Sequence, residues 1–319
     1  HGRVVGVKLD AAPSQKQPKG VCIVSFSFSV PTNLVFGQGA IQKLHKQRLP
    51  GKKALIVISS GKSTRANGYL DAVQDQLTQA GVEYAVFDKV SANPVVDTVM
   101  AGAAFARENG CDFVLGLGGG SSIDAAKAIA MVTPNEGNYW DYVYGGTGGG
   151  QKMKNKPLPI VAIPTTAGTG SEVTSFSVIT DKQNGNIKYP LADYRLTPDV
   201  AIIDPQFTRS MPKSIVADTG LDVLTHAIEA YTSTLATNFA DGQAMEAVRL
   251  VFKYLRRSYA GGEERLIPRE KMHYAATMAG MAFANAFLGV CHSLAHTLGS
   301  CFHLPHGLAN AILLSYVIE

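Results

Sequence analysis

Apolar and polar residues alternate along residues 21–36, and Pro31 interrupts the alternation. A period of two with many β-branched residues is typical of a half-buried strand. Proline lacks the N–H that a central ladder needs, so it is tolerated mainly at sheet edges. The pattern therefore predicts a strand or hairpin at the edge of a sheet.

From Ala40 to residue 118, short apolar runs take turns with segments of helical spacing. Runs of four to eight apolar residues predict buried strands, and the longer periodic segments predict helices. The predicted strands span 53–59, 83–90 and 111–118, and the predicted helices span about 40–47, 69–80 and 96–109. Such alternation predicts a parallel sheet with right-handed crossovers and helices on both faces.

The alternation stops after AIIDP (201–205), and from Lys213 the pattern is mostly helical. The predicted helices span 213–233, 240–258, 268–288, 290–299 and 306–318. We therefore expect three parts: a polar N-terminal arm at 1–20, an α/β domain at 21–208 and a helical domain at 209–319.

A glycine-rich turn lies in GLGGGSSIDAAKAIAMV (116–132), where a buried strand meets a helix. We expect Ser121 or Ser122 to cap this helix and Asp124 to lie in its first turn. Glycine lets the backbone approach a ligand closely, and free N–H groups at a helix start favour an anion such as pyrophosphate. The spacing is not G-x-G-x-x-G, so an ordinary tight turn is the alternative.

A second polar loop follows the next predicted strand, within residues 157–180. Its hydroxyls and glycine N–H groups suit phosphate and ribose oxygens, so we interpret it as the other wall of a nucleotide cleft; a plain polar turn is the alternative. The loop residues are Thr165, Thr166, Gly168, Thr169, Gly170 and Ser171. Residues 140–157 are interpreted as a flexible, glycine-heavy surface loop without chemistry.

Histidines recur in three segments of the helical part. Asp222 and His226 are four residues apart, one helical turn, and His292 and His296 repeat that spacing. A buried carboxylate is costly unless it is paired or coordinated. The alternative is a simple Asp222–His226 pair with the other histidines in the core. Taken together, the segments favour one divalent metal held by Asp222, His226, His292 and His306.

Bulk composition narrows the class of protein. The chain has 319 residues, 46% hydrophobic and 17% charged, which predicts a folded core rather than disorder. A net charge of +4 without a basic cluster argues against a nucleic-acid partner. No run reaches transmembrane length and no signal peptide is evident, so we expect a cytoplasmic protein without a membrane partner. The cysteines, expected to be reduced and buried, are Cys22, Cys111, Cys291 and Cys301.

Five long stretches together resemble the iron-containing (group III) alcohol dehydrogenases: GGGSSIDAAKAIA, IPTTAGTGSEVTSFSVITD, DTGLDVLTHAIEAY, LGVCHSLAHTLG and LPHGLANAILL. IKYPLADYRLTPDVAIIDP and MAFANAFLGVCHSLAH are similar to the alcohol dehydrogenase half of bifunctional aldehyde–alcohol dehydrogenases and to alcohol dehydrogenases of bacterial microcompartments. The resemblance covers about residues 25–319. It implies a nucleotide-binding α/β domain followed by an all-α metal-binding domain, the dehydroquinate synthase-like fold.

The resemblance also implies roles for single residues. The family's metal ligands fall on Asp222, His226, His292 and His306, and His296 matches a histidine proposed to transfer protons near the nicotinamide. We add Ser60, in the turn after the second strand, and Asp124 to the coenzyme residues that it implies. The expected coenzyme residues are then Ser60, Asn93, Gly119, Gly120, Ser121, Asp124, Thr165, Thr166, Thr169 and Lys188.

The implied activity is reversible hydride transfer between short-chain primary alcohols or aldehydes and NAD(P)(H). Nitrogen and oxygen ligands suit Fe²⁺ and also accept Zn²⁺. Many NAD-preferring members have an aspartate after the strand that matches ALIV, whereas this chain has Ser59, Ser60, Gly61 and Lys62 there. Without that acid a 2′-phosphate is tolerated, so the choice between NAD and NADP stays open.

The sequence leaves alternative functions open. Among enzymes, these are a polyol or lactaldehyde/propanediol oxidoreductase and a lyase acting on sugar phosphates. Outside enzymes, the alternative is a non-catalytic filament or shell-associated subunit. We expect a homodimer or higher homo-oligomer. Association with a microcompartment is a further alternative, and whether residues 3–20 direct the protein there stays open. Family members continue with further helices, so the chain is expected to be truncated after Glu319.

Overall fold

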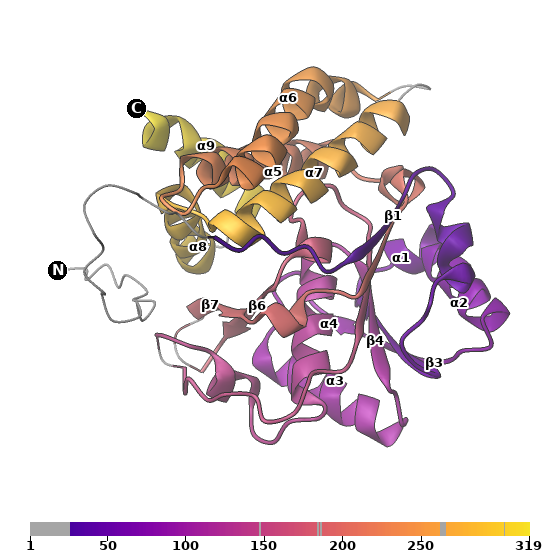
Figure 1. Ribbon diagram of the computed structural model, residues 1–319. Coiled ribbons are helices and arrows are strands. Elements are labelled where there is room, and N and C mark those ends of the chain that lie inside the picture. The colour runs from indigo at the N-terminus through magenta and orange to yellow at the C-terminus, as the bar shows by residue number, and fades with distance from the viewer. Residues whose placement is uncertain (1–25, 147, 184, 186, 262–265, 303) are drawn as a thin grey trace.

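The computed structural model describes residues 26–146, 148–183, 185, 187–261, 266–302 and 304–319. A sheet with helices on both faces forms one half of the molecule, and a group of long helices forms the other (Figure 1). The predicted arm at 1–20 lies outside the described residues. The predicted fold class, a parallel α/β half followed by a helical half, is confirmed.

The six-stranded sheet has the order β1-β8-β5-β4-β2-β3, and all its neighbouring strands are parallel. Its strands are β1 (Asn33–Phe36), β2 (Lys53–Ser59), β3 (Glu83–Val90), β4 (Phe113–Gly118), β5 (Ile160–Pro164) and β8 (Val200–Ile203). The chain adds β3 on one side of β2 and then places β4, β5 and β8 on the other. The direction of winding therefore reverses between β2 and β4, the position where such sheets bind ligands.

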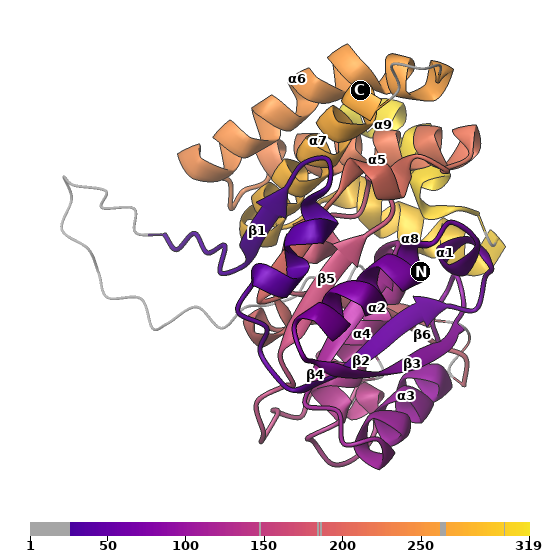
Figure 2. The same ribbon diagram turned by 90° about the vertical axis from the view of Figure 1, so that its right-hand side faces the viewer.

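Both faces of the sheet are covered, which explains the continuous apolar runs of its strands. Along β2, Leu55 and Val57 pack against α3 (Val96–Glu108) and α4 (Gly120–Val132). Ile56 and Ile58 point to the other face, against the 3₁₀ helix Ala40–Lys46 and α2 (Tyr69–Gln79). Figure 2 shows α2 and α3 on opposite sides of the strands. A short helix, α1 (Ser63–Ala66), follows β2.

Three predictions for the sheet half need correction. Of the predicted edge strand, only Asn33–Phe36 forms a strand among the described residues, and it does lie at the sheet edge. Residues 140–157 are not simply a surface loop, because Tyr139–Tyr142 form a 3₁₀ helix and the side chains of Trp140, Tyr142 and Val143 are buried in the core. The sequence also did not reveal that β6 (Phe176–Asp181) and β7 (Ile187–Ala192) form a separate antiparallel hairpin.

The helical half begins after β8, where a 3₁₀ helix at Pro205–Thr208 leads to the first long helix. Its helices are α5 (Lys213–Thr232), α6 (Asn238–Ala260), α7 (Leu266–Ala286), α8 (Val290–Phe302) and α9 (His306–Ile318). All five agree with predicted helices to within three residues at either end. Buried alanines on α5, α6 and α7 let these helices approach closely around one apolar cluster.

Small residues join the two halves. Gly170, which follows β5 and has φ 62°, lies against Gly280 of α7, so a Cβ on Gly170 would come within 2.7 Å of the Gly280 Cα. Gly168 packs in the same way against Thr219 of α5. The carboxyl end of β5 is thereby held directly beneath α5 and α7.

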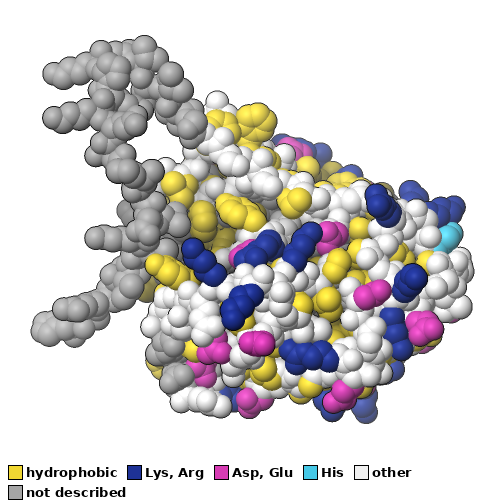
Figure 3. All heavy atoms as spheres, turned by 60° about the horizontal axis from the view of Figure 1, so that its bottom comes forward, with side chains coloured by type: hydrophobic (Ala, Val, Ile, Leu, Met, Phe, Trp, Pro, Cys, Tyr) yellow, Lys and Arg dark blue, Asp and Glu magenta, His cyan; other side chains and the backbone are white. Residues whose placement is uncertain are grey.

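The described surface carries charges of both signs, and the cysteines differ in their exposure. Among the described residues, no single helix is long and apolar enough to cross a membrane; α7 and α8 pass that test only as a pair, bent by 106°. On the face of the sheet half shown in Figure 3, lysine and arginine side chains lie among acidic ones. Cys111 and Cys291 are buried as expected, but Cys301 is exposed on α8, so the prediction of burial was wrong there.

Candidate active site

The expected coenzyme residues lie at the carboxyl ends of neighbouring strands. Ser60 follows β2, Asn93 follows β3, Gly119–Ser121 follow β4, and Thr165–Thr169 follow β5. Carboxyl ends of parallel strands form one edge of the sheet, where doubly wound folds bind nucleotides. Backbone bonds join these turns, because Ser60 N donates to Val90 O (2.9 Å) and Thr165 N donates to Gly118 O (2.9 Å).

The glycine turn after β4 packs tightly on the polar loop after β5. Gly118 has φ 151°, a conformation that side chains disfavour, and a Cβ on Gly120 would come within 2.6 Å of Thr169. Helix α4 starts at Gly120, with Gly119 at its N-cap position and no side-chain cap. The prediction that Ser121 or Ser122 caps this helix was wrong, since the Ser121 hydroxyl donates to Ala92 O (2.6 Å) instead. An uncapped helix start keeps N–H groups free for an anion.

Asp124 does not face the coenzyme edge. Its carboxylate accepts hydrogen bonds from the Ser171 hydroxyl (2.5 Å) and from Val178 N (3.0 Å). Burial raises the pKa of this carboxyl, and the nearby Lys127 lowers it in part. Both oxygens are thus committed to the protein, which corrects the expected coenzyme contact: Asp124 ties the polar loop and β6 to α4.

Lys188 connects the coenzyme edge to the helical half. Its ammonium donates to Asn93 Oδ1 (2.8 Å), so two residues expected in the cleft are in direct contact. Lys188 lies on β7, which contacts α8, and a Cβ on Gly299 of α8 would come within 4.0 Å of Nζ. Burial lowers the pKa of Lys188.

Four side chains from three helices converge in the helical half. One potential ligand atom from each of Asp222, His226, His292 and His306 lies within 4.8 Å of all the others. Asp222 Oδ1 lies 3.6 Å from His292 Nε2 and 3.5 Å from His306 Nε2, and the His226 and His292 rings stack with centroids 4.4 Å apart. Sequence spacing predicted the Asp222–His226 pair, and the fold brings His292 and His306 to it.

Burial and charge set the protonation of this cluster. Burial raises the pKa of Asp222, but the imidazoles of His226, His306 and His292 outweigh it and hold that pKa far below its usual range. Burial lowers the pKa of His226 to about 3, and the pKa of His306 is also lowered. Burial also lowers the pKa of His292, but its hydrogen bonds with Asp222 and Glu229 outweigh burial and raise that pKa overall. An ionised carboxylate and neutral imidazoles are the states that bind a metal.

Two buried residues in contact with the cluster were missed at the sequence level. Glu229 Oε2 lies 2.5 Å from His292 Nδ1. The Asn310 amide donates to Asp222 Oδ1 (2.7 Å) and lies 3.1 and 3.2 Å from Nε2 of His292 and His306. The available signals were Glu229 three residues after His226 and Asn310 four after His306, spacings that place them on the same helix faces.

His296 lies beside the cluster without joining it. Its ring centroid is 5.0 Å from that of His306 and 6.4 Å from that of His292, close to edge-on to the latter. Burial lowers its pKa to about 3, and the neighbouring His306 adds to this effect. His296 is half-buried and is not among the four grouped residues.

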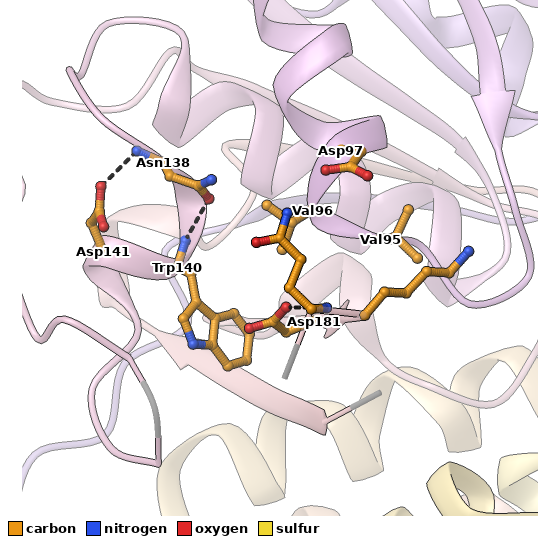
Figure 4. A pocket seen from close by; sticks show the side chains of 9 residues that line it. Val95, Val96, Asp97, Asn138, Trp140, Asp141 and Asp181 are labelled. Atoms are coloured by element: carbon orange, nitrogen blue, oxygen red, sulfur yellow. Dashed lines mark hydrogen bonds between the residues drawn. The ribbon is translucent and has the colours of Figure 1, made fainter. Parts of the chain in front are cut away.

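A pocket of about 130 Å³ lies in the sheet half and shares no residue with the expected coenzyme residues or with the metal cluster. It lies between the start of α3, the 3₁₀ helix at Tyr139–Tyr142 and the end of β6 (Figure 4). Asn138 and Asp141 on its wall are bonded to the backbone as a capping box, and Asp181 accepts from Gln183 N. Because these groups serve the local backbone, we assign this pocket no chemistry.

Family comparisons agree with this arrangement. Residues 31–205 match the family model of iron-containing alcohol dehydrogenase, and residues 216–319 match that of the Fe-containing alcohol dehydrogenase family, C-terminal. The chain belongs to the iron-containing alcohol dehydrogenases. It is therefore an oxidoreductase of alcohols, as the resemblance implied.

Individual relatives of this alcohol dehydrogenase differ in size. The chain is 44% identical to the NADPH-dependent butanol dehydrogenase of Clostridium saccharobutylicum, with 92% of this chain and 73% of the relative covered. It is also 44% identical to the bifunctional aldehyde-alcohol dehydrogenase of Escherichia coli, covering 91% of this chain but 33% of that longer protein. A crystal structure of 1,3-propanediol oxidoreductase superposes with a TM-score of 0.85 at 41% identity, covering 92% of this chain and 75% of the other.

The cluster of this alcohol dehydrogenase fits a divalent metal. Its donors are one carboxylate and three imidazoles, a set that suits Fe²⁺ and accepts Zn²⁺. The buried His226 Nδ1 has no hydrogen-bond partner in the described part of the chain. The side chains of Asp222, His226 and His292 are 3 to 6% exposed, while that of His306 is 35% exposed, so the cluster opens on one side. A metal bound there supplies Lewis acidity that stabilises negative charge on the alcohol oxygen.

Proposed function

We propose that this protein interconverts short-chain primary alcohols and aldehydes with NADP(H) or NAD(H), using one divalent metal held by Asp222, His226, His292 and His306. The observation that carries the proposal is the convergence of these four side chains within 4.8 Å. Lys188 supports it, because this one side chain contacts Asn93 of the coenzyme edge and lies beside α8, which carries His292. This connection supports a coenzyme site next to the proposed metal site.

The proposed coenzyme site uses the strand ends already described. Gly119, Gly120 and Ser121 would bind the pyrophosphate at the uncapped start of α4, and Thr165, Thr166 and Thr169 would form the opposite wall. Ser60 and Lys62 are exposed in the turn after β2, which has no acid. The acid nearby on β3, Asp88, is paired with Arg65 at 2.8 Å. In the described part of the chain, the acid near this turn is therefore paired and does not oppose a 2′-phosphate, and we propose that NADPH is used; the butanol dehydrogenase relative is named NADPH-dependent.

Apolar side chains next to the metal cluster favour a short alkyl substrate. Phe283 stacks on His226 with ring centroids 4.5 Å apart. Phe287 sits at the break between α7 and α8 with φ 63°, a left-handed conformation that is rare for an aromatic residue, and contacts Phe176 edge-on. Phe176 also stacks on Phe283, so the three rings form an apolar group next to His226. A propanediol is a second candidate substrate, because the 41% identical solved structure is named 1,3-propanediol oxidoreductase.

The test is anaerobic reconstitution of the metal-free protein with Fe²⁺, followed by assays with short aldehydes and either NADPH or NADH. We expect coenzyme oxidation that depends on metal, with NADPH accepted. Propanal and 3-hydroxypropanal, assayed side by side, separate the simple alcohol from the diol as product. Metal binding without turnover of any short aldehyde would contradict the proposal, as would turnover that is independent of metal.

His296 is proposed to transfer the alcohol proton to solvent, one helical turn beyond His292. We expect His296→Ala to keep its metal and to lose turnover by about 10²-fold or more, the usual contribution of general acid–base groups. Metal content and kcat should be measured on the same sample. If His296→Ala lost its metal together with its activity, His296 would instead be a ligand.

A further inference from the structure

Glu229 is a buried carboxylate that contacts the metal cluster without belonging to it. It lies on α5, three residues after His226, and is 5% exposed. Its Oε2 is 2.5 Å from His292 Nδ1. The carboxylate oxygen is therefore within hydrogen-bond distance of the ring N–H and is placed to accept from it.

The two oxygens of Glu229 have separate partners. Oε1 accepts from Cys291 N at 2.7 Å, close to the start of α8. Oε2 accepts from His292 Nδ1 and, more distantly, from His292 N at 3.3 Å. The same side chain thus anchors the first turn of α8 and fixes how the His292 ring is rotated.

A neutral imidazole carries its proton on one nitrogen and offers a lone pair on the other. With Nδ1–H donating to Glu229, the lone pair is on Nε2, the atom that lies 3.6 Å from Asp222 Oδ1 inside the cluster. Carboxylates bonded to the far nitrogen of a ligating histidine fix its tautomer and raise its basicity. This inference rests on the proposed metal site.

We propose that Glu229 is a positioning residue of the metal centre, which holds His292 in the tautomer and rotation needed to bind the metal through Nε2. Glu229 itself does not bind the metal. Its loss weakens metal binding by reorienting a ligand rather than by removing one.

Glu229→Gln tests this with little change in shape. An amide nitrogen in place of Oε2 donates to Nδ1 and so favours the Nε2–H tautomer, which has no lone pair for the metal. We expect Co²⁺ affinity, measured by chelator competition, to fall by about 10- to 100-fold. The visible absorption of the Co²⁺-loaded variant should change as well, because the set of nitrogen ligands is altered. Loss of a helix anchor alone would not change that spectrum.

Two further variants keep the outcome decisive. Glu246→Gln, at a half-buried site on α6 where the carboxylate pairs with Arg249, is the matched control and should bind Co²⁺ as the unmodified protein does. Glu229→Ala removes both oxygens. Its melting temperature without metal and its Co²⁺ affinity are both compared with those of the unmodified protein. Co²⁺ affinity and spectrum unchanged in a folded Glu229→Gln or Glu229→Ala would overturn the inference. Failure of the unmodified protein to bind Co²⁺ would overturn the metal site itself.

Discussion

Replacing His306 by alanine is expected to remove bound metal and to abolish turnover while the fold is retained. His306 offers Nε2 to the cluster 3.5 Å from Asp222 Oδ1, so its loss leaves three ligands. The metal contributes several kcal/mol of charge stabilisation, and each 1.4 kcal/mol is tenfold in rate, so we expect turnover to fall by about 10³-fold or more. The side chain is 35% exposed, so the change in unfolding free energy should stay within about 1 kcal/mol.

The measurement is metal content by elemental analysis together with kcat for an aldehyde and the urea unfolding midpoint. His45→Ala is the matched control, because His45 lies in the 3₁₀ helix of the sheet half and bonds Gln76. It should keep both metal and activity. Unchanged metal content in His306→Ala would show that His306 is not a ligand.

Replacing Lys127 by methionine is expected to cause the largest loss of stability. Lys127 lies on α4, fully buried, and its ammonium donates to Thr174 O (2.8 Å), Thr174 Oγ1 (3.2 Å) and Phe176 O (2.9 Å). Burial lowers its pKa to about 8, while the charges of Asp124 and Glu172 support its protonated form. Removing one member of a buried charged group leaves the others uncompensated, so we expect a loss of about 3 kcal/mol or more.

The same variant should weaken coenzyme binding. The residues that Lys127 bonds connect the polar loop after β5 to β6, and methionine of similar length cannot donate to their carbonyl oxygens. Urea unfolding and NADPH titration are the measurements, with the exposed Lys89→Met as control. Equal unfolding midpoints for Lys127→Met and the unmodified protein would contradict a structural role for this ammonium.

Much of the fold could be predicted from the hydrophobic pattern. Strands such as Lys53–Ser59 and helices such as Val96–Glu108 were placed to within a residue or two. A strand that is buried on both faces leaves a continuous apolar run, and a helix that is buried along one stripe leaves a regular apolar repeat. The β6–β7 hairpin, which lies outside the six-stranded sheet, was not predicted; its strands pair with each other, and Thr180 of β6 also forms an isolated bridge with Val95. Trp140 and Tyr142 were missed because their glycine-rich neighbours suggested a solvated loop, whereas both side chains pack in the apolar core.

For the candidate site, the sequence identified the residue types and their spacing, but not the direction in which each side chain points. Asp222 and His226 were predicted as a helical pair, yet only the packing of α5, α8 and α9 brings His292 and His306 to them. Asp124 was placed in the first turn of a helix that faces a nucleotide, and the structure turns its carboxylate towards Ser171 and Val178 instead. Pairwise contacts between distant segments, such as that of Glu229 with His292, leave no period in the sequence.

The most direct test of this account is a crystal of the protein loaded with Fe²⁺ or Zn²⁺, with the metal located by anomalous scattering. We predict one strong peak bonded to Asp222, His226, His292 and His306, at about 2.0 to 2.2 Å for zinc. A metal peak bonded elsewhere, or one that leaves Asp222 or His306 unbound, would contradict the proposed metal centre.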